Sequence, residues 1–119
     1  MVKILIVEDK KLLREALGQV IERYYGSFDA VADSSKALKC LALNDYDLVI
    51  SDNNMVRANE GLELMVMLEA RYPDVKRILT SGVLMSVDDP MDYCAHAFLE
   101  KPYELSAVRD TIDSLLAER

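Results

Sequence analysis

Residues 46–55 read Tyr-Asp-Leu-Val-Ile-Ser-Asp-Asn-Asn-Met, and this stretch decides the fold. Its apolar run Leu48–Ile50 is short and continuous, and polar residues typical of a turn follow it. Such a run predicts a strand of a parallel sheet, because a strand covered by helices on both faces loses the usual apolar–polar alternation. Asp52 then stands at the carboxyl end of the strand, which is where open α/β sheets bind their ligands.

Four more strands are expected in the sequence, two before this one and two after it. They are Val2–Val7, the weaker Phe28–Ala32, Lys76–Thr80 and Ala97–Leu99. Between them, apolar residues recur at helical spacing. Helices are therefore expected from Leu12 to Tyr24, from a cap at Ser34 or Ser35 onward, from Leu62 to Tyr72 and from Leu105 to Leu116. In 83–94 Pro90 interrupts any long helix, so we expect a short or irregular one.

This alternation predicts an α/β fold of five βα units. Short crossovers of this kind require a doubly wound, parallel five-stranded sheet with helices on both faces. A length of 119 residues and a hydrophobic fraction of 51% suit a single domain over residues 1–119.

Composition excludes several classes of function. A net charge of −7 argues against direct nucleic-acid binding, because no basic stripe is present to neutralise phosphates. Cys40 and Cys94 are too few and too far apart to form a disulfide framework. The apolar segment Val2–Val7 is too short for a signal peptide, and no apolar run is long enough to span a membrane. We therefore expect a cytoplasmic protein with reduced thiols.

Charged residues follow two other predicted strands. Glu8 and Asp9 come after the first strand, and Lys101 comes after the fifth. A parallel sheet brings its carboxyl strand ends together, so these residues are expected to meet Asp52. Mg²⁺ prefers oxygen ligands of this kind, with Asp9 and Asp52 as direct ligands and Glu8 acting through a water molecule. A lysine near a phosphoryl group would cancel part of its charge, so Asp52 is predicted to be a phosphate acceptor.

Each of these signals also has an ordinary structural explanation. Glu8-Asp9 can be a solvated pair at a helix start, and Asp52 can be a turn residue. Lys101 precedes Pro102, which is common in the first turn of a helix and can also hold a cis bond. Ser81 stands at the end of the fourth strand and can donate a hydrogen bond to a phosphate oxygen.

The hydroxyl position has a second candidate. Thr80, next to Ser81, is a rival for the same role, and either residue can equally belong to a simple turn. The sequence therefore predicts one hydroxyl donor at this strand end but leaves open whether it is Ser81 or Thr80.

The ordered set Glu8-Asp9, Asp52-x-x-Met55, Ser81-Gly82 and Lys101-Pro102 resembles the receiver domain of two-component response regulators. The resemblance covers residues 2–118 and implies a flavodoxin-like sheet of strand order 2-1-3-4-5.

The resemblance also implies a role for each charged residue. Asp52 would accept a phosphoryl group from a sensor histidine kinase or phosphotransfer protein, and Lys101 would contact that group. Mg²⁺ would be bound by Glu8, Asp9 and Asp52, with the backbone carbonyl of Asn54.

The same resemblance implies a conformational switch. Ser81 would move toward the new phosphate, and Phe98 would move into the vacated space; core packing alone is the other explanation for Phe98. Asn54 and Val83 are positions expected to tune dephosphorylation. The output would be a downstream protein partner or output domain, or a phosphorylation-dependent homodimer.

Three features depart from the family pattern. Val56 replaces the usual proline after Met55, and the loop from Asp52 to Gly61 is one residue longer than usual. The segment between Ser81 and Lys101 is slightly short and contains Pro90. Because this region belongs to the partner-binding face in the family, we hypothesise an atypical output partner or dimer mode.

Two alternatives have different functional consequences. A phosphatase of the haloacid dehalogenase type needs a second acid two residues after its nucleophile, but position 54 is Asn. A phosphorylation-independent receiver would act only as an interaction module. The favoured interpretation is a signalling phosphoacceptor that assists its own phosphotransfer and is not a metabolic enzyme. Residues 1–119 contain no output module, so we expect the chain either to act alone by docking a partner or to be one domain of a longer protein.

Overall fold

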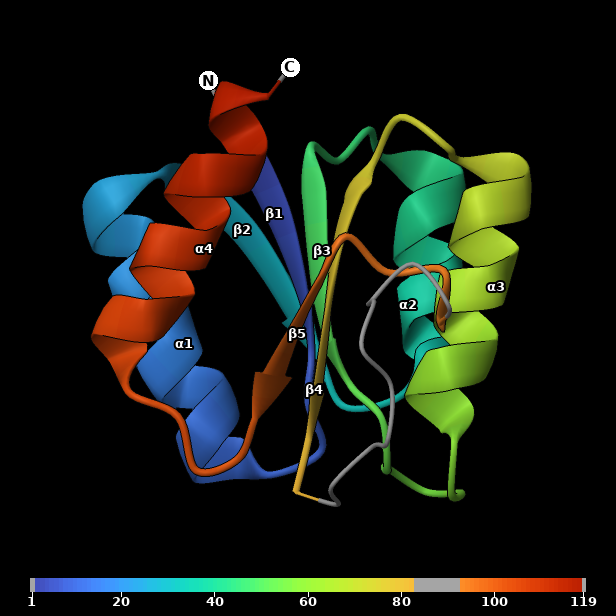
Figure 1. The fold of residues 1–119 in the computed structure, drawn as a ribbon. Helices are drawn as coiled ribbons and strands as arrows, with labels where there is room; N and C mark the ends of the chain where they lie inside the picture. Colours follow the sequence, from blue (N-terminus) through green and yellow to red (C-terminus); the bar gives the residue numbers. More distant parts are fainter. Residues whose placement is uncertain (1, 83–92, 119) are drawn as a thin grey trace.

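The computed structural model describes residues 2–82 and 93–118, and its five parallel strands form one sheet (Figure 1). The strands are β1 (Val2–Val7), β2 (Gly26–Val31), β3 (Leu48–Asp52), β4 (Lys76–Ser81) and β5 (Ala97–Glu100). Their order is β2-β1-β3-β4-β5. The expected flavodoxin-like topology is confirmed.

Four helices cover the sheet in the described part of the chain. They are α1 (Lys11–Tyr24), α2 (Ser34–Leu43), α3 (Glu60–Arg71) and α4 (Leu105–Ala117). Figure 1 shows α1 and α4 on one face of the sheet, with α2 and α3 on the other. None of these helices is long and apolar enough to cross a membrane.

The two central strands explain the continuous apolar runs. Ile4 and Ile6 of β1 pack in the cluster beneath α1 and α4, whereas Leu5 and Val7 pack in the cluster beneath α2 and α3. All of β3 is likewise buried. A strand buried on both faces has no solvent side on which to place polar residues, so its apolar run is unbroken.

Several expected boundaries shift by one residue, and three other expectations were wrong. Strand β2 begins at Gly26 rather than Phe28, because it pairs with β1 from Val2 onward, and Gly26 adopts a φ of 101° after the end of α1. The cap of α2 is Asp33, whose side chain accepts a hydrogen bond from the Lys36 N–H, rather than Ser34 or Ser35. Helix α3 begins at Glu60, two residues earlier than expected.

Several other expectations concern residues 83–92. The short or irregular helix, Pro90 and the tuning position Val83 lie outside the described residues. Both cysteines, Cys40 and Cys94, are free and half-buried.

Candidate functional site

The carboxyl ends of β1 and β3 bring three acidic side chains together. One carboxylate oxygen from each of Glu8, Asp9 and Asp52 lies within 4.8 Å of the others. Val7 pairs with Ser51 across the sheet, so the residue after β1 and the last residue of β3 become neighbours. Glu8 and Asp52 are only 1% and 5% exposed, whereas Asp9 is open to solvent.

Lys101 supplies the positive charge at this cluster. Its Nζ lies 2.9 Å from Glu8 Oε1 and 3.3 Å from Asp52 Oδ2. The Lys101 backbone N–H donates to the Ser81 carbonyl oxygen at 2.8 Å, which extends the β4–β5 pairing to the lysine. The Lys101–Pro102 peptide bond is cis. Pairing with β4 thus fixes the backbone position of Lys101, and from there its side chain reaches both buried carboxylates.

Burial is the main influence on the ionisation of the cluster, and the charges within it come second. Burial raises the pKa of both Glu8 and Asp52, although Lys101 opposes the change. For Lys101, burial lowers the pKa, but the hydrogen bond and charge of Glu8 and the charge of Asp52 outweigh it and leave the pKa raised. A divalent cation would offset the remaining negative charge.

The donor atoms of the cluster suit magnesium. They are all carboxylate oxygens, which Mg²⁺ prefers together with several retained waters. The exposed position of Asp9 gives such waters room, while buried Glu8 already receives hydrogen bonds at both oxygens, from Lys101 Nζ and the Lys10 N–H. The residues present therefore fit a hydrated divalent cation.

The residue after the predicted acceptor anchors the following loop. The Asn53 N–H donates to the Thr80 carbonyl, and its side-chain Oδ1 accepts from the Leu62 N–H of α3 at 3.0 Å. Gly61 donates its N–H to the Asn53 carbonyl oxygen, and a Cβ at position 61 would overlap the Asp52 carbonyl oxygen. The start of α3 can therefore lie against the end of β3 only if residue 61 has no side chain.

Asn54, the predicted tuning position, is bound within the same loop. Its Oδ1 accepts the backbone N–H of Asn59 at 3.0 Å, and Asn59 has a φ of 62°. The Asn59 side chain in turn accepts from Asn53 Nδ2 at 3.1 Å. These bonds hold the Asn54 side chain to the loop.

Sheet register distinguishes the two candidate hydroxyl residues. Phe98 is opposite Leu79 and packs with it on the α3 face of the sheet. Strand alternation places Ser81 on that same face, whereas Thr80 shares the opposite face with Ile78. Both hydroxyl residues are buried. The structure thus groups Ser81, rather than Thr80, with the predicted switch aromatic.

Three neighbours of the cluster had no assigned role in the sequence: Asn53, Gly61 and Tyr103. Asn53 resembles any turn asparagine until its bond to α3 is seen, and Gly61 marked only the end of a loop. The Tyr103 hydroxyl is buried and has no hydrogen-bond partner among the described residues. Burial and the charges of Glu8 and Asp52 raise its pKa, so the phenol stays protonated.

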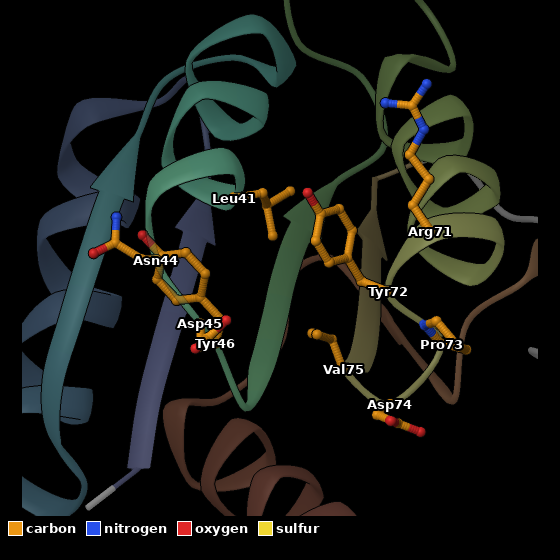
Figure 2. Close-up of a pocket in the computed structure, with 9 residues that line it drawn as sticks. All are labelled: Leu41, Asn44, Asp45, Tyr46, Arg71, Tyr72, Pro73, Asp74 and Val75. Carbon is orange, nitrogen blue, oxygen red and sulfur yellow. The ribbon is translucent and has the colours of Figure 1, made fainter.

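A cavity of about 310 Å³ lies at the opposite end of the sheet (Figure 2). Its lining comes from the C-terminal ends of α2 and α3 and from the turns that lead from them into β3 and β4: Leu41, Asn44, Asp45, Tyr46, Arg71, Tyr72, Pro73, Asp74 and Val75. Because these turns precede the strands, the cavity is separate from the acidic cluster at the carboxyl ends.

Comparison with known proteins agrees with this geometry. The model of the response regulator receiver domain matches residues 4–113. The chain is 35% identical over 112 residues to the response regulator protein FleR of Pseudomonas aeruginosa, covering 92% of this chain and 24% of FleR. It is 29% identical to the transcriptional regulatory protein CutR of Streptomyces coelicolor, covering 87% of this chain and 48% of CutR. The chain thus spans a quarter to a half of these relatives.

Solved structures extend the match to three dimensions. The response regulator TrrA of Thermotoga maritima, solved in complex with Mg²⁺ and BeF, is 26% identical with a TM-score of 0.85 over 97% of this chain and 99% of TrrA. A Francisella receiver domain at 18% identity shares the fold, with a TM-score of 0.88 over 99% of this chain and 98% of its own. The chain belongs to the receiver domain family of two-component response regulators.

Proposed function

We propose that Asp52 accepts a phosphoryl group and that the resulting aspartyl phosphate controls a partner. The observation that carries this proposal is the arrangement of Lys101, whose ammonium joins buried Glu8 and Asp52 beside exposed Asp9. The proposed unit is one domain over residues 1–119. Its phosphoryl donor is a sensor histidine kinase or a phosphotransfer protein.

In the proposed reaction, an Asp52 carboxylate oxygen attacks phosphorus. A P–O bond forms as the P–N bond to the donor histidine breaks, and the imidazole leaves with the bonding electrons. Lys101 would use its remaining N–H donor on a phosphoryl oxygen. Mg²⁺, held by Glu8, Asp9, Asp52 and the Asn54 carbonyl, would neutralise charge on the phosphoryl oxygens.

The output of the reaction is a change of conformation. In this proposal Ser81 donates its hydroxyl to a phosphoryl oxygen, and Phe98 moves toward the space that Ser81 leaves. The shared face of Leu79, Ser81 and Phe98 supports this pairing. A phosphate contact made in only one state biases such a two-state element.

The phosphorylated receiver is proposed to act on a downstream target. FleR and CutR are longer regulators, so an output domain or a separate protein that reads the phosphorylated face is the proposed target. Dimerisation of phosphorylated receivers is a second route to the same output. The Asn54 and Val83 positions are proposed to set the lifetime of the phosphate, Asn54 by way of its bond to Asn59.

Intact-mass spectrometry after incubation with acetyl phosphate and Mg²⁺ tests the phosphoacceptor role. The expected result is one added phosphoryl group that requires Mg²⁺ and is absent from Asp52→Asn. If the aspartyl phosphate is hydrolysed too rapidly to be detected by mass, beryllofluoride serves as a stable mimic of the phosphoryl group, and NMR detects its binding. Absence of both signals would instead support a phosphorylation-independent interaction module.

A further inference from the structure

We infer that Tyr103 is a further binding residue of the phosphoryl site, with a hydroxyl that pairs only when the site is loaded. The inference rests on the proposed function and adds a hydrogen-bonding group to it. The partner is an oxygen that the ligand brings: a phosphoryl oxygen, which accepts from the phenol, or a water bound to the cation, which donates to the phenol oxygen.

The Tyr103 hydroxyl is unpaired among the described residues. Tyr103 Oη is buried from solvent and makes no hydrogen bond within residues 2–82 and 93–118. Buried hydroxyl groups nearly always have a partner, because an unmade hydrogen bond costs free energy. A phenylalanine at position 103 would fill the same apolar space beside the core cluster without this cost. The hydroxyl therefore destabilises the unloaded protein.

Tyr103 also lies beside the acidic cluster. Tyr103 follows Lys101–Pro102 directly, and besides burial the charges of Glu8 and Asp52 raise the pKa of its hydroxyl. With Lys10, Leu13 and Lys101, it lines a cavity of about 370 Å³ beside the acidic cluster. Tyr103 thus lies beside the place where phosphoryl and metal-bound oxygens would arrive, with its hydroxyl covered until they do.

The carboxylate acceptors near Tyr103 already have donors. Glu8 already receives Lys101 Nζ at one oxygen and the Lys10 N–H at the other, and Asp52 receives Lys101 Nζ. A ligand adds new acceptor oxygens to a site whose carboxylates are already engaged. A protonated phenol is a suitable donor to such an oxygen, and hydrogen bonds to charged acceptors are the strong ones.

The test compares Tyr103→Phe with the wild-type chain in the unloaded and loaded states. In the absence of ligand, the variant is expected to unfold at the same temperature or up to about 5 °C higher, because only an unpaired group has been removed. With Mg²⁺ and beryllofluoride present, its affinity for beryllofluoride is expected to fall roughly tenfold. This opposite response of the two states distinguishes a ligand donor from a structural residue.

Tyr25→Phe is the matched control. Its hydroxyl donates to Asp113 Oδ1 at 2.6 Å, far from the acidic cluster. Removing this paired hydroxyl is expected to lower the unfolding temperature and to leave beryllofluoride affinity unchanged.

Calorimetric titrations with Mg²⁺ alone and with Mg²⁺ plus beryllofluoride identify the partner of the hydroxyl. A weaker Mg²⁺ affinity in Tyr103→Phe assigns the bond to metal-bound water, and a loss confined to beryllofluoride assigns it to the phosphoryl group. Equal affinities of variant and wild type in both titrations would overturn the inference, as would a lower unfolding temperature of the unloaded variant. If the wild type itself binds neither ligand, the proposed function fails and not this inference alone.

Discussion

Two lysines, one near the start of β1 and one at the carboxyl edge of the sheet, lie in different surroundings. The acids around Lys3 each accept a hydrogen bond, whereas Lys101 lies beside three clustered carboxylates and can neutralise only one of them. Lys3 Nζ donates to Asn44 Oδ1 at 2.9 Å and lies 3.6 Å from Asp29 Oδ2. The same Asp29 oxygen accepts from the Tyr46 hydroxyl at 2.6 Å. The Lys3 backbone N–H donates to Asp47 Oδ2 at 2.8 Å.

The Lys101 cluster differs from the Lys3 network because it contains an excess negative charge and a hydroxyl without a hydrogen-bond partner among the described residues. Asp9 adds an exposed charge beside Glu8 and Asp52, and the Tyr103 hydroxyl lacks a partner in the described structure. The Lys3 network stabilises the fold as it stands. The Lys101 cluster is stabilised further only when positive charge and new acceptor atoms arrive, and this difference indicates a binding site.

The largest effect is expected at the backbone of the carboxyl edge. Gly61→Ala places a methyl group onto the Asp52 carbonyl, so strand β3 or helix α3 has to move. We expect a loss of about 3 kcal/mol or more in the free energy of unfolding, together with a loss of phosphorylation. Urea denaturation measures the first and intact mass the second.

Gly82→Ala is the matched control for this prediction. A Cβ at position 82 meets its nearest atom, Lys101 Cβ, at 3.9 Å, which is ordinary contact. We expect a change of no more than about 0.5 kcal/mol. Equal effects of the two substitutions would show that the close approach at Gly61 is not needed.

The two lysines provide the next comparison. Lys101→Met leaves Glu8 and Asp52 buried without their shared cation, for an expected loss of about 3 kcal/mol at pH 7. Lys3→Met removes a partly exposed ion pair and should cost less than about 1 kcal/mol. Urea denaturation at pH 7 compares them, and a larger loss for Lys3→Met would contradict the distinction between the two regions.

Magnesium should stabilise only one of the two regions. At ten times its dissociation constant, Mg²⁺ is expected to add about 1.4 kcal/mol to the free energy of unfolding. Asp9→Asn should remove most of this gain, because Asp9 is one of three clustered carboxylates. Asp29→Asn, in the Lys3 network, should retain it. Thermal unfolding with and without Mg²⁺ measures the gain, and its survival in Asp9→Asn would place the ion elsewhere.

The smallest expected effect is a pH dependence at the starts of β4 and β5. His96 Nδ1 accepts the Arg77 backbone N–H at 3.0 Å, and burial with the charges of Arg77 and Lys76 lowers the pKa of His96 below 6.5. The unfolded chain takes up this proton first. The stabilisation is therefore complete above pH 6.5 and is lost as pH falls toward the folded-state pKa.

His96→Asn tests this dependence, because Asn retains an acceptor near the Nδ1 position and does not titrate. The difference in unfolding free energy between wild type and variant should shrink as pH falls from 7 to 5. Since His96 is the only histidine of the chain, its pKa can be measured by NMR without assignment. A pKa at or above 6.5 would contradict the prediction.

Much of the fold could be predicted because central strands have a strong local signal. Leu48–Ile50 has no polar residue, and its burial on both faces explains why. The start of β2 was missed because Gly26 and Ser27 have weak strand propensity and are placed by pairing with β1. The Asp33 cap was missed because Asp, Ser and Ser in succession all suit that position.

The site was predictable where strand ends alone determine it. Glu8, Asp9, Asp52 and Lys101 meet because parallel strands share one carboxyl edge. The grouping of Ser81 with Phe98 needed the register between β4 and β5. The roles of Asn53, Gly61 and Tyr103 depend on contacts with distant residues, which no local pattern in the chain specifies.

The most direct test of the central claim is to locate the phosphoryl group on the chain. The wild-type protein is phosphorylated with acetyl phosphate and Mg²⁺, reduced with borohydride, which converts an aspartyl phosphate into homoserine, and mapped by tandem mass spectrometry. If Asp52 is the phosphate acceptor, homoserine appears at position 52 and nowhere else. Conversion at position 8 or 9, or at a residue of the Lys3 network, would contradict it.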